Sequence, residues 1–191
     1  MSTIAVVAKN RVAAIAADSL TTWGTAKESA AYIINHDKII QVGNSYLAIS
    51  GPTSAKLALK DYFRTKSAVD LSNVDAIFRV WIELHAALKG SYFLKSSETE
   101  DGAFESTRFD VLIANPHGIF GVAAHRDVQK FSKLYYAYGT GWQYALGAMH
   151  AVYSEDSISA EEVAKIGIRA AAEFDTDTGL PVISHSLTLT E

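Results

Sequence analysis

The residues best suited to chemistry stand at the start of the chain, where Ser2 follows the initiator Met1 and precedes an apolar run at residues 3–8. If Met1 is removed, Ser2 carries a hydroxyl and a free α-amine on one residue, which is a nucleophile with its own base. A free α-amine has a pKa of about 7.7 to 8.0, so no histidine is needed to accept the hydroxyl proton. Many proteins begin Met-Ser without this chemistry, so the start needs support from later residues.

Four later segments could support this chemistry. One has a carboxylate after the second apolar run, one has a lysine before the third apolar run, and two have a glycine at the end of an apolar run. These segments are Ala16-Ala17-Asp18-Ser19, Asp37-Lys38-Ile39-Ile40, Ile49-Ser50-Gly51 and Tyr138-Gly139-Thr140-Gly141. Together with Ser2 they resemble the proteasome β-subunit family, including the bacterial HslV peptidase, and the betaproteobacterial proteasome homologues (BPH) are nearest. The resemblance runs over most of the chain.

The resemblance implies a catalytic set of Ser2, Asp18 and Lys38, at positions where the family has an N-terminal threonine, an Asp and a Lys. A buried ammonium beside the nucleophile would lower the pKa of the α-amine and stabilise a developing alkoxide. A buried carboxylate would offset the cost of burying that ammonium. In the alternative interpretation, Asp18 ends a strand and Lys38 faces solvent, but the joint pattern favours catalysis.

The resemblance also implies residues that contact the substrate. Gly51 matches the position whose backbone N–H meets the oxyanion, and such a donor is worth roughly 2.7 to 4 kcal/mol of barrier. The alternative is a glycine that simply ends a strand before Pro52. Thr22 matches a threonine that bonds the substrate main chain as an added strand, and Ile49 and Thr53 complete the expected substrate contacts.

Three further residues, Thr140, Asp175 and Thr178, match family positions that orient the terminal amine. Thr140 has an alternative role as a helix N-cap. The resemblance implies no required cofactor, but the late turn offers the backbone carbonyls of Ala172, Asp175 and Thr178 to a cation. Oxygen ligands suit a hard cation such as Mg²⁺ or Na⁺, although a turn needs no metal. The histidines show no metal-binding spacing, and the glycines form no phosphate-binding loop.

The chain departs from the family pattern at two points. Serine replaces the commoner threonine and lacks the β-methyl that restricts χ1, so we expect a less pre-organised hydroxyl and lower activity. The spacing from Asp18 to Lys38 is several residues longer than usual, which predicts an enlarged loop around residues 26–35. No long propeptide precedes Ser2, so we expect methionine aminopeptidase to expose it. A retained Met1 would block the site.

The composition bounds the class of protein. A length of 191 residues with 49% hydrophobic and 20% charged residues predicts one soluble domain over 1–191. The formal net charge of −4 argues against nucleic-acid binding, and the lack of cysteine excludes thiol chemistry. Lys9 and Arg11 interrupt the first apolar run, so we expect neither a signal peptide nor a membrane span, and a cytoplasmic location.

Hydrophobic periodicity predicts strands, a helix pair, more strands, a second helix pair and a last strand. This order favours an α+β fold, a four-layer αββα sandwich of the amino-terminal-nucleophile (Ntn) hydrolase type. The second helix is expected to bury Phe78, Trp81 and Ile82, and the last helix to bury Phe174. Loops are expected at residues 19–35 and, as a mobile excursion, at 96–102. The expected strands are 3–8, 12–17, 38–42, 46–50, 109–114, 119–124, 128–138 and 180–189.

These features together predict an endopeptidase that degrades unfolded polypeptide. The resemblance implies stacked homo-oligomeric rings of six or seven subunits, fed by a hexameric AAA+ ATPase unfoldase. Two alternatives stay open: a catalytically silent ring-forming scaffold that retains Met1, and a small-molecule amidohydrolase of the same fold.

Overall fold

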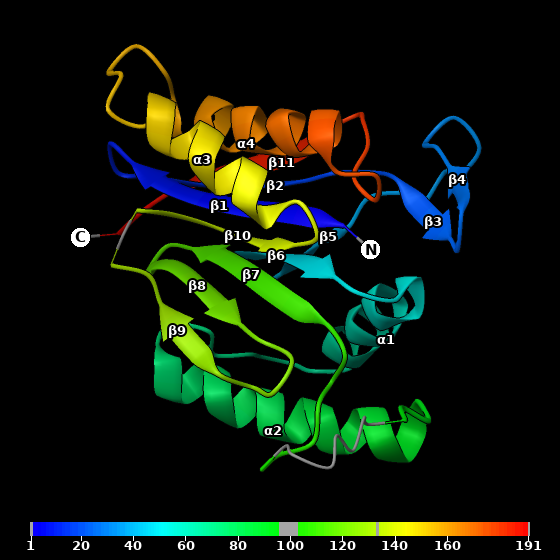
Figure 1. The fold of residues 1–191 in the computed structure, drawn as a ribbon. Coiled ribbons are helices and arrows are strands. Elements are labelled where there is room, and N and C mark those ends of the chain that lie inside the picture. The colour runs from blue at the N-terminus through cyan, green and yellow to red at the C-terminus, as the bar shows by residue number, and fades with distance from the viewer. Residues whose placement is uncertain (1, 96–102, 133, 191) are drawn as a thin grey trace.

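Two stacked β-sheets form the centre of the molecule, and a pair of helices covers the outer face of each sheet (Figure 1). The computed structural model describes residues 2–95, 103–132 and 134–190. The predicted α+β fold, an αββα sandwich, is confirmed. The excursion predicted at 96–102 lies outside the described residues.

The first sheet has the strand order β10-β1-β2-β11. Helices α3 and α4 pack against one face of it through a cluster rich in alanine, and small side chains let helices and sheet approach closely. The elements of this half are β1 (Thr3–Lys9), β2 (Val12–Ala17), β10 (Tyr135–Gly139), β11 (Ile183–Thr188), α3 (Trp142–Val152) and α4 (Ala160–Phe174).

The second sheet has the order β5-β6-β7-β8-β9 and carries helices α1 and α2 on its outer face. Its core is built from larger aliphatic and aromatic side chains than that of the first half. The elements are β5 (Ile39–Val42), β6 (Ser45–Ser50), β7 (Asp110–Asn115), β8 (Gly118–Val122), β9 (Val128–Lys130), α1 (Thr53–Arg64) and α2 (Val74–Ser91).

Alternation along β1 explains why its sequence is apolar throughout. Ile4 and Val6 point into the layer between the sheets, whereas Ala5 and Val7 point towards α3 and α4. A strand covered on both faces has no solvent side to mark with polar residues. The strand is therefore fixed in the interior, and its first residue is held rigidly.

Two segments differ from the predicted elements. Residues 19–35 contain a hairpin, β3 (Thr21–Trp23) and β4 (Ala26–Glu28), in which the Trp23 indole N–H donates to Glu28 Oε2 at 2.8 Å. The predicted strand at 128–138 divides into β9 and β10, which belong to different sheets. No glycine or proline within 128–138 marks the point where the chain changes layers.

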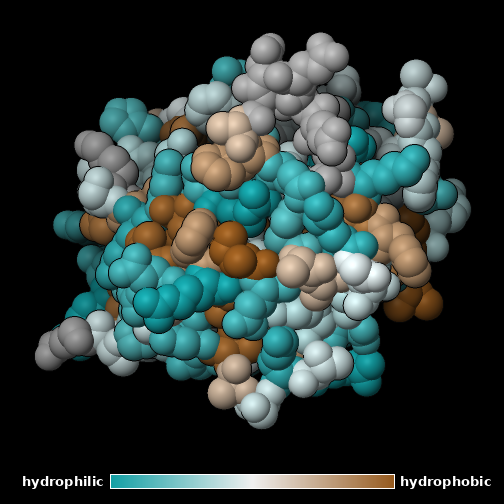
Figure 2. Space-filling model, turned by 90° about the horizontal axis from the view of Figure 1, so that it is seen from below, coloured by the Kyte–Doolittle hydropathy of each residue, from teal (hydrophilic) through white to brown (hydrophobic). Residues whose placement is uncertain are grey.

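Helix α2 is rotated from its predicted orientation. Its buried face is formed by Ile77, Trp81, Leu84 and Leu88, so the prediction that Phe78 and Ile82 are buried is wrong. Both are nearly half exposed, and Figure 2 shows hydrophobic residues interspersed with hydrophilic ones on the surface seen from that side. Phe174 at the end of α4 is likewise exposed, contrary to prediction. No helix among the described residues is long and apolar enough to cross a membrane.

Candidate active site

Strand pairing brings distant parts of the chain to the start of β1. Because β1 is antiparallel to both β2 and β10, its first residues lie beside the last residues of those strands, with Ile4 opposite Ala17 and Thr3 opposite Gly139. Ser2 precedes β1, is buried, and its carbonyl accepts the N–H of Thr140 at 3.0 Å. Figure 1 shows the N-terminus at the edge where β6 ends and the β3–β4 hairpin projects.

Asp18 is fully buried and accepts four hydrogen bonds. Its Oδ1 accepts from Lys38 Nζ at 2.7 Å and from the Thr3 N–H at 3.1 Å. Its Oδ2 accepts from the N–H groups of Leu20 at 3.0 Å and Gly179 at 3.1 Å. Burial raises the pKa of the carboxyl, and the Lys38 ammonium and the backbone donors oppose that shift. The carboxylate is thus held by three separate segments of the chain.

The Lys38 side chain is 13% exposed and ends in two short hydrogen bonds. Its Nζ donates to Asp18 Oδ1 and, at 2.6 Å, to the Leu20 carbonyl. Burial lowers the pKa of the ammonium, and the charge of Asp18 works against that shift. Lys38 therefore does not face solvent, and it lines the same cavity as Ser2.

Gly51 follows β6 and has a φ of +155°, which favours glycine. A Cβ built on it would lie 2.5 Å from Phe109 Cβ and 3.2 Å from the Arg108 carbonyl oxygen. The site therefore excludes any side chain here, and the backbone at Gly51 stays open to the cavity that Ser2 lines.

A second network connects the late residues of the predicted site. Asp175 Oδ2 accepts from the hydroxyls of Thr140 at 2.6 Å and Thr178 at 2.5 Å. The Thr178 hydroxyl also meets Thr3 Oγ1 at 2.6 Å, and Thr3 Oγ1 accepts the Gly141 N–H at 3.0 Å. The N-cap of α3 is Gly141, so the N-cap alternative for Thr140 is wrong.

Thr3 is the residue of this network that the sequence reasoning missed. It is completely buried, its N–H donates to Asp18 and its hydroxyl belongs to the Thr178 and Asp175 network. It therefore joins the two networks directly beside Ser2. A hydroxyl residue at the start of an otherwise apolar strand was the available signal.

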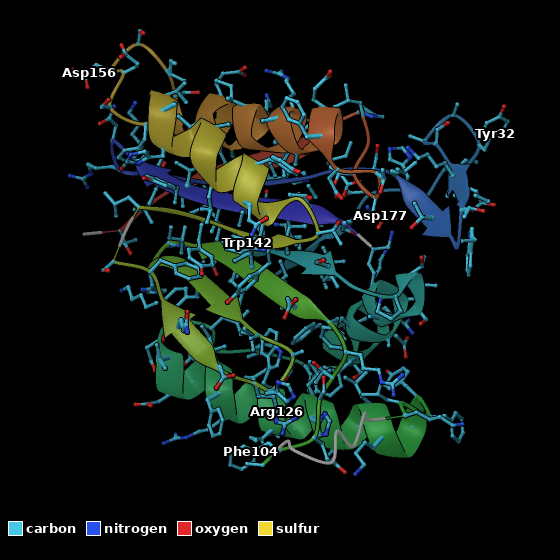
Figure 3. The ribbon with its side chains drawn as sticks, in the orientation of Figure 1. Tyr32, Phe104, Arg126, Trp142, Asp156 and Asp177 are labelled. Carbon is cyan, nitrogen blue, oxygen red and sulfur yellow. The ribbon has the colours of Figure 1, made fainter. Side chains whose placement is uncertain are left out.

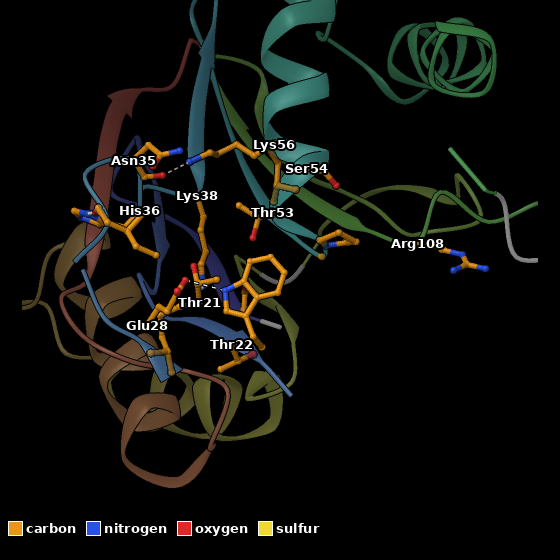
Figure 4. Close-up of a pocket in the computed structure, with 17 residues that line it drawn as sticks. Thr21, Thr22, Glu28, Asn35, His36, Lys38, Thr53, Ser54, Lys56 and Arg108 are labelled. Carbon is orange, nitrogen blue, oxygen red and sulfur yellow. Dashed lines mark hydrogen bonds between the residues drawn. The ribbon is translucent and has the colours of Figure 1, made fainter. Parts of the chain in front are cut away.

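The cavity beside Ser2 has a volume of about 550 Å³ (Figure 4). The predicted substrate contacts Thr22, Ile49 and Thr53 all line it. The longer spacing before Lys38 supplies much of its wall, because Trp23, Glu28, Ile33, Asn35 and His36 also line it. Lys56 Nζ donates to the carbonyls of Asn35 and Asp37, which ties the end of this segment to α1.

The turn after α4 contains the carbonyls predicted to bind a cation. Ala172 lies in the last turn of α4, where carbonyls lack helical partners. The Asp175 carbonyl already accepts the Thr178 N–H at 3.3 Å, so a cation would use its second lone pair. Within the described residues, no group of three His, Cys, Asp or Glu side chains has a metal-binding arrangement. The backbone site for Na⁺ or Mg²⁺ stays a prediction.

Comparison with solved structures decides the family. Thiobacillus denitrificans BPH in complex with epoxomicin is 54% identical, with a TM-score of 0.93 over 99% of this chain and 100% of that one. The chain belongs to the BPH family. A second structure of Thiobacillus denitrificans BPH is also 54% identical, with a TM-score of 0.94 over 98% of each chain.

The present chain also shares its fold with a eukaryotic HslV from Trypanosoma brucei. That structure is 16% identical, with a TM-score of 0.68 over 97% of this chain and 99% of that one. No family model and no curated protein matched the sequence. The predicted membership of the proteasome family is confirmed.

Proposed function

We propose that this chain is the subunit of a self-compartmentalising endopeptidase in which Ser2, freed of Met1, is the nucleophile. The observation that carries the proposal is the single cavity lined by Ser2, Lys38 and Gly51, with Asp18 bonded to Lys38 beneath it. Met1 lies outside the described residues, and its removal is part of the proposal.

In the acylation step, Ser2 Oγ forms a bond to the scissile carbonyl carbon of the substrate. Its hydroxyl proton passes to the Ser2 α-amine through a water molecule. The negative charge that develops on the carbonyl oxygen is stabilised by the Gly51 N–H. The C–N bond then breaks, and the proton held by the α-ammonium moves to the departing nitrogen.

In the deacylation step, water attacks the ester carbon and gives one proton to the Ser2 α-amine. The ester bond breaks, the proton returns to Ser2 Oγ, and the carboxylic acid product leaves. The α-amine thus serves as base twice and acid twice. Water is the only co-reactant that the cycle consumes.

Lys38 and Asp18 act electrostatically in this scheme. The Lys38 ammonium favours the neutral form of the α-amine and stabilises the developing alkoxide. Asp18 keeps the ammonium in place. The hydroxyls and carboxylate of Thr140, Asp175 and Thr178 orient the α-amine from the other side, with Thr3 as their link to β1.

The proposal includes assembly into stacked rings of six or seven copies and delivery of unfolded polypeptide by a hexameric AAA+ ATPase. Membership of the family supports ring assembly. A second argument is that an open active site in a free subunit would expose folded and unfolded proteins alike to cleavage. Enclosure restricts access to extended chains.

The test uses an unfolded protein such as casein and a small peptide amide as substrates. The purified chain is expected to cleave casein, whereas Ser2→Ala is expected to be inactive and to sediment with the same mass as wild type. Cleavage of the amide without casein would favour a small-molecule amidase. Absence of all cleavage in wild type freed of Met1 would overturn the peptidase, and retention of Met1 in the native chain would favour the silent scaffold.

A further inference from the structure

A second cavity of about 490 Å³ adjoins the cavity that Ser2 lines. Gly51 and Arg108 line both cavities. The remaining walls of the second cavity come mainly from β10, the start of α3 and the start of β7, and they include Asp110, Tyr136, Tyr138, Thr140 and Trp142. Trp142 is the first residue of α3 (Figure 3).

The position of the second cavity fits the departing half of a substrate. Thr22 and Ile49, the expected contacts of the acyl half, line the first cavity with Ser2. Thr140, whose N–H donates to the Ser2 carbonyl, lines the second. A peptide whose scissile carbonyl lies between Ser2 and Gly51 therefore extends from the first cavity into the second, and its amine product leaves through the second.

The charge inside this cavity is a partly buried carboxylate. Asp110 pairs with Ser50 across β6 and β7, and its Oδ1 accepts the Ala124 N–H at 2.9 Å. Among the described residues, no group donates a hydrogen bond to its other oxygen. Burial raises the pKa of Asp110, and a cation entering the cavity would lower that pKa again. The carboxylate thus offers one vacant acceptor to a cationic group.

Aromatic rings form the walls next to this carboxylate. Tyr136 and Tyr138 lie edge to face with centroids 5.5 Å apart, and Tyr136 stacks on Phe131 at 4.3 Å. Burial, with a contribution from the Asp110 charge, raises the pKa of Tyr138 to about 12, so the phenol stays neutral. Such rings accommodate the methylene stem of a lysine or arginine and attract its charge.

One permanent cation near the cavity, Arg108, acts against this preference, but it is exposed. Arg108 lies at the rim that the two cavities share. Solvent and salt screen exposed charges strongly. Asp110 acts at shorter range and in a lower dielectric, so it dominates inside the cavity.

We propose that this cavity is the leaving-group subsite and that Asp110 makes it select substrates with lysine or arginine in the first position after the scissile bond. The inference rests on the proposed endopeptidase function. It adds a specificity residue that the catalytic network does not contain.

The experiment compares quenched fluorescent peptides that are identical except for Lys, Gln or Glu at the first position after the cleaved bond. Wild type is expected to show kcat/KM in the order Lys, Gln, Glu, with Lys over Gln by about fivefold. Asp110→Asn keeps an acceptor for the Ala124 N–H and is expected to reduce the Lys-to-Gln ratio to about one. Asp156→Asn removes an equal charge at a distant loop (Figure 3) and should leave the ratio unchanged.

A peptidyl aminomethylcoumarin, whose leaving group has no side chain, separates the two claims. Asp156→Asn should hydrolyse it at the wild-type rate, so this substrate reports the peptidase alone. A wild type that cleaves every substrate with a Lys-to-Gln ratio of one would overturn the subsite while leaving the peptidase intact. A wild type that cleaves none would overturn the peptidase itself.

If Asp110→Asn fails to fold, Trp142→Leu provides an independent probe, because Trp142 is 41% exposed at the cavity wall. It is expected to raise KM for the Lys peptide about threefold, through the lost cation–π contact, with little change for the Glu peptide. Equal effects on both peptides would count against recognition of a cation.

Discussion

The base and the rim of the candidate active site are built in different ways. The base consists of two buried side chains, Asp18 and Thr3, and two partly buried ones, Lys38 and Asp175. Each makes more than one hydrogen bond to other segments of the chain. The rim, residues 21–36, is a two-stranded hairpin and a loop that expose Trp23, Tyr32 and Ile34. The groups that we propose to act on every peptide bond are therefore fixed in the core, whereas the groups that we propose to meet variable side chains lie on a separate projecting segment.

This difference predicts that a change in the base affects activity and stability together. Lys38→Met should reduce kcat by about 10³-fold, because the α-amine and the alkoxide lose their nearby positive charge. It should also lower the free energy of unfolding by about 3 kcal/mol, because Asp18 becomes an unpaired buried carboxylate. Steady-state kinetics and urea denaturation measure both. Full activity in this variant would show that Lys38 has no electrostatic role.

At the junction between base and rim, Gly51→Ala should lower kcat by about 10²-fold, because the new methyl group displaces the backbone that holds the oxyanion donor. The clash with Phe109 should destabilise the fold as well. Gly147→Ala is the matched control: it lies in α3 with nothing within 4 Å of an added Cβ, and it should be neutral or stabilise by up to about 1 kcal/mol. Equal kinetics for the two variants would remove Gly51 from the mechanism.

Within the base, Thr3→Val should cost about 1 to 3 kcal/mol of stability, because it leaves the Gly141 N–H without its acceptor. We expect kcat to fall about tenfold and the acidic limb of the pH–rate profile to shift as the α-amine loses its orientation. Thr3→Ser keeps the hydroxyl and should recover most of the activity. A valine variant with a wild-type pH profile would mean that Thr3 serves only the fold.

In the rim, Trp23→Ala should change specificity rather than stability. Trp23 is 62% exposed, and within the described part of the chain its indole N–H donates only to Glu28 of the same hairpin. The free energy of unfolding should therefore change by less than about 0.5 kcal/mol. KM for peptides that occupy the first cavity should rise a few-fold while kcat stays constant. A large loss of stability would show that the hairpin supports the base after all.

Replacement of Glu105, which lies outside both regions, is expected to have the smallest effect on stability. Hydrogen bonds from Lys89 and His85 lower its pKa from 4.5 to about 2. Because the folded pKa lies below the unfolded one, the stabilisation is complete above pH 4.5 and disappears as the pH falls towards 2. Glu105→Gln should therefore lower Tm slightly at pH 6, and the two proteins should converge near pH 2. Catalysis should be unaffected, and a lower kcat would indicate coupling to the site.

Sequence patterns predicted the layers, and they named residues that the structure brings together at the candidate site, because both depend on local signals. Strand ends place Asp18 and Gly51, and the αββα order follows from the alternation of strands and helix pairs. Thr3 was missed because its partner Thr178 is 175 residues away, and no local pattern shows which hydroxyls meet. The phase of α2 was misassigned because apolar residues occupy more than one face, so packing rather than periodicity chose Leu84 over Phe78.

The walls of the two cavities were the least predictable part. The first depends on a hairpin inside a segment without sustained periodicity, and the second on Asp110, which is an ordinary strand residue in the sequence. The second cavity forms only where β6, β7 and β10 converge. The residues of the candidate site could thus be named from the sequence, whereas the walls of the two cavities could not.

The intact mass of the chain purified from its own host, before and after incubation with epoxomicin, tests the central claim most directly. The account predicts a mass lacking Met1 and a gain of one inhibitor per chain, mapped by fragmentation to both the hydroxyl and the α-amine of Ser2. A chain that retains Met1, or an adduct at any other residue, would contradict it.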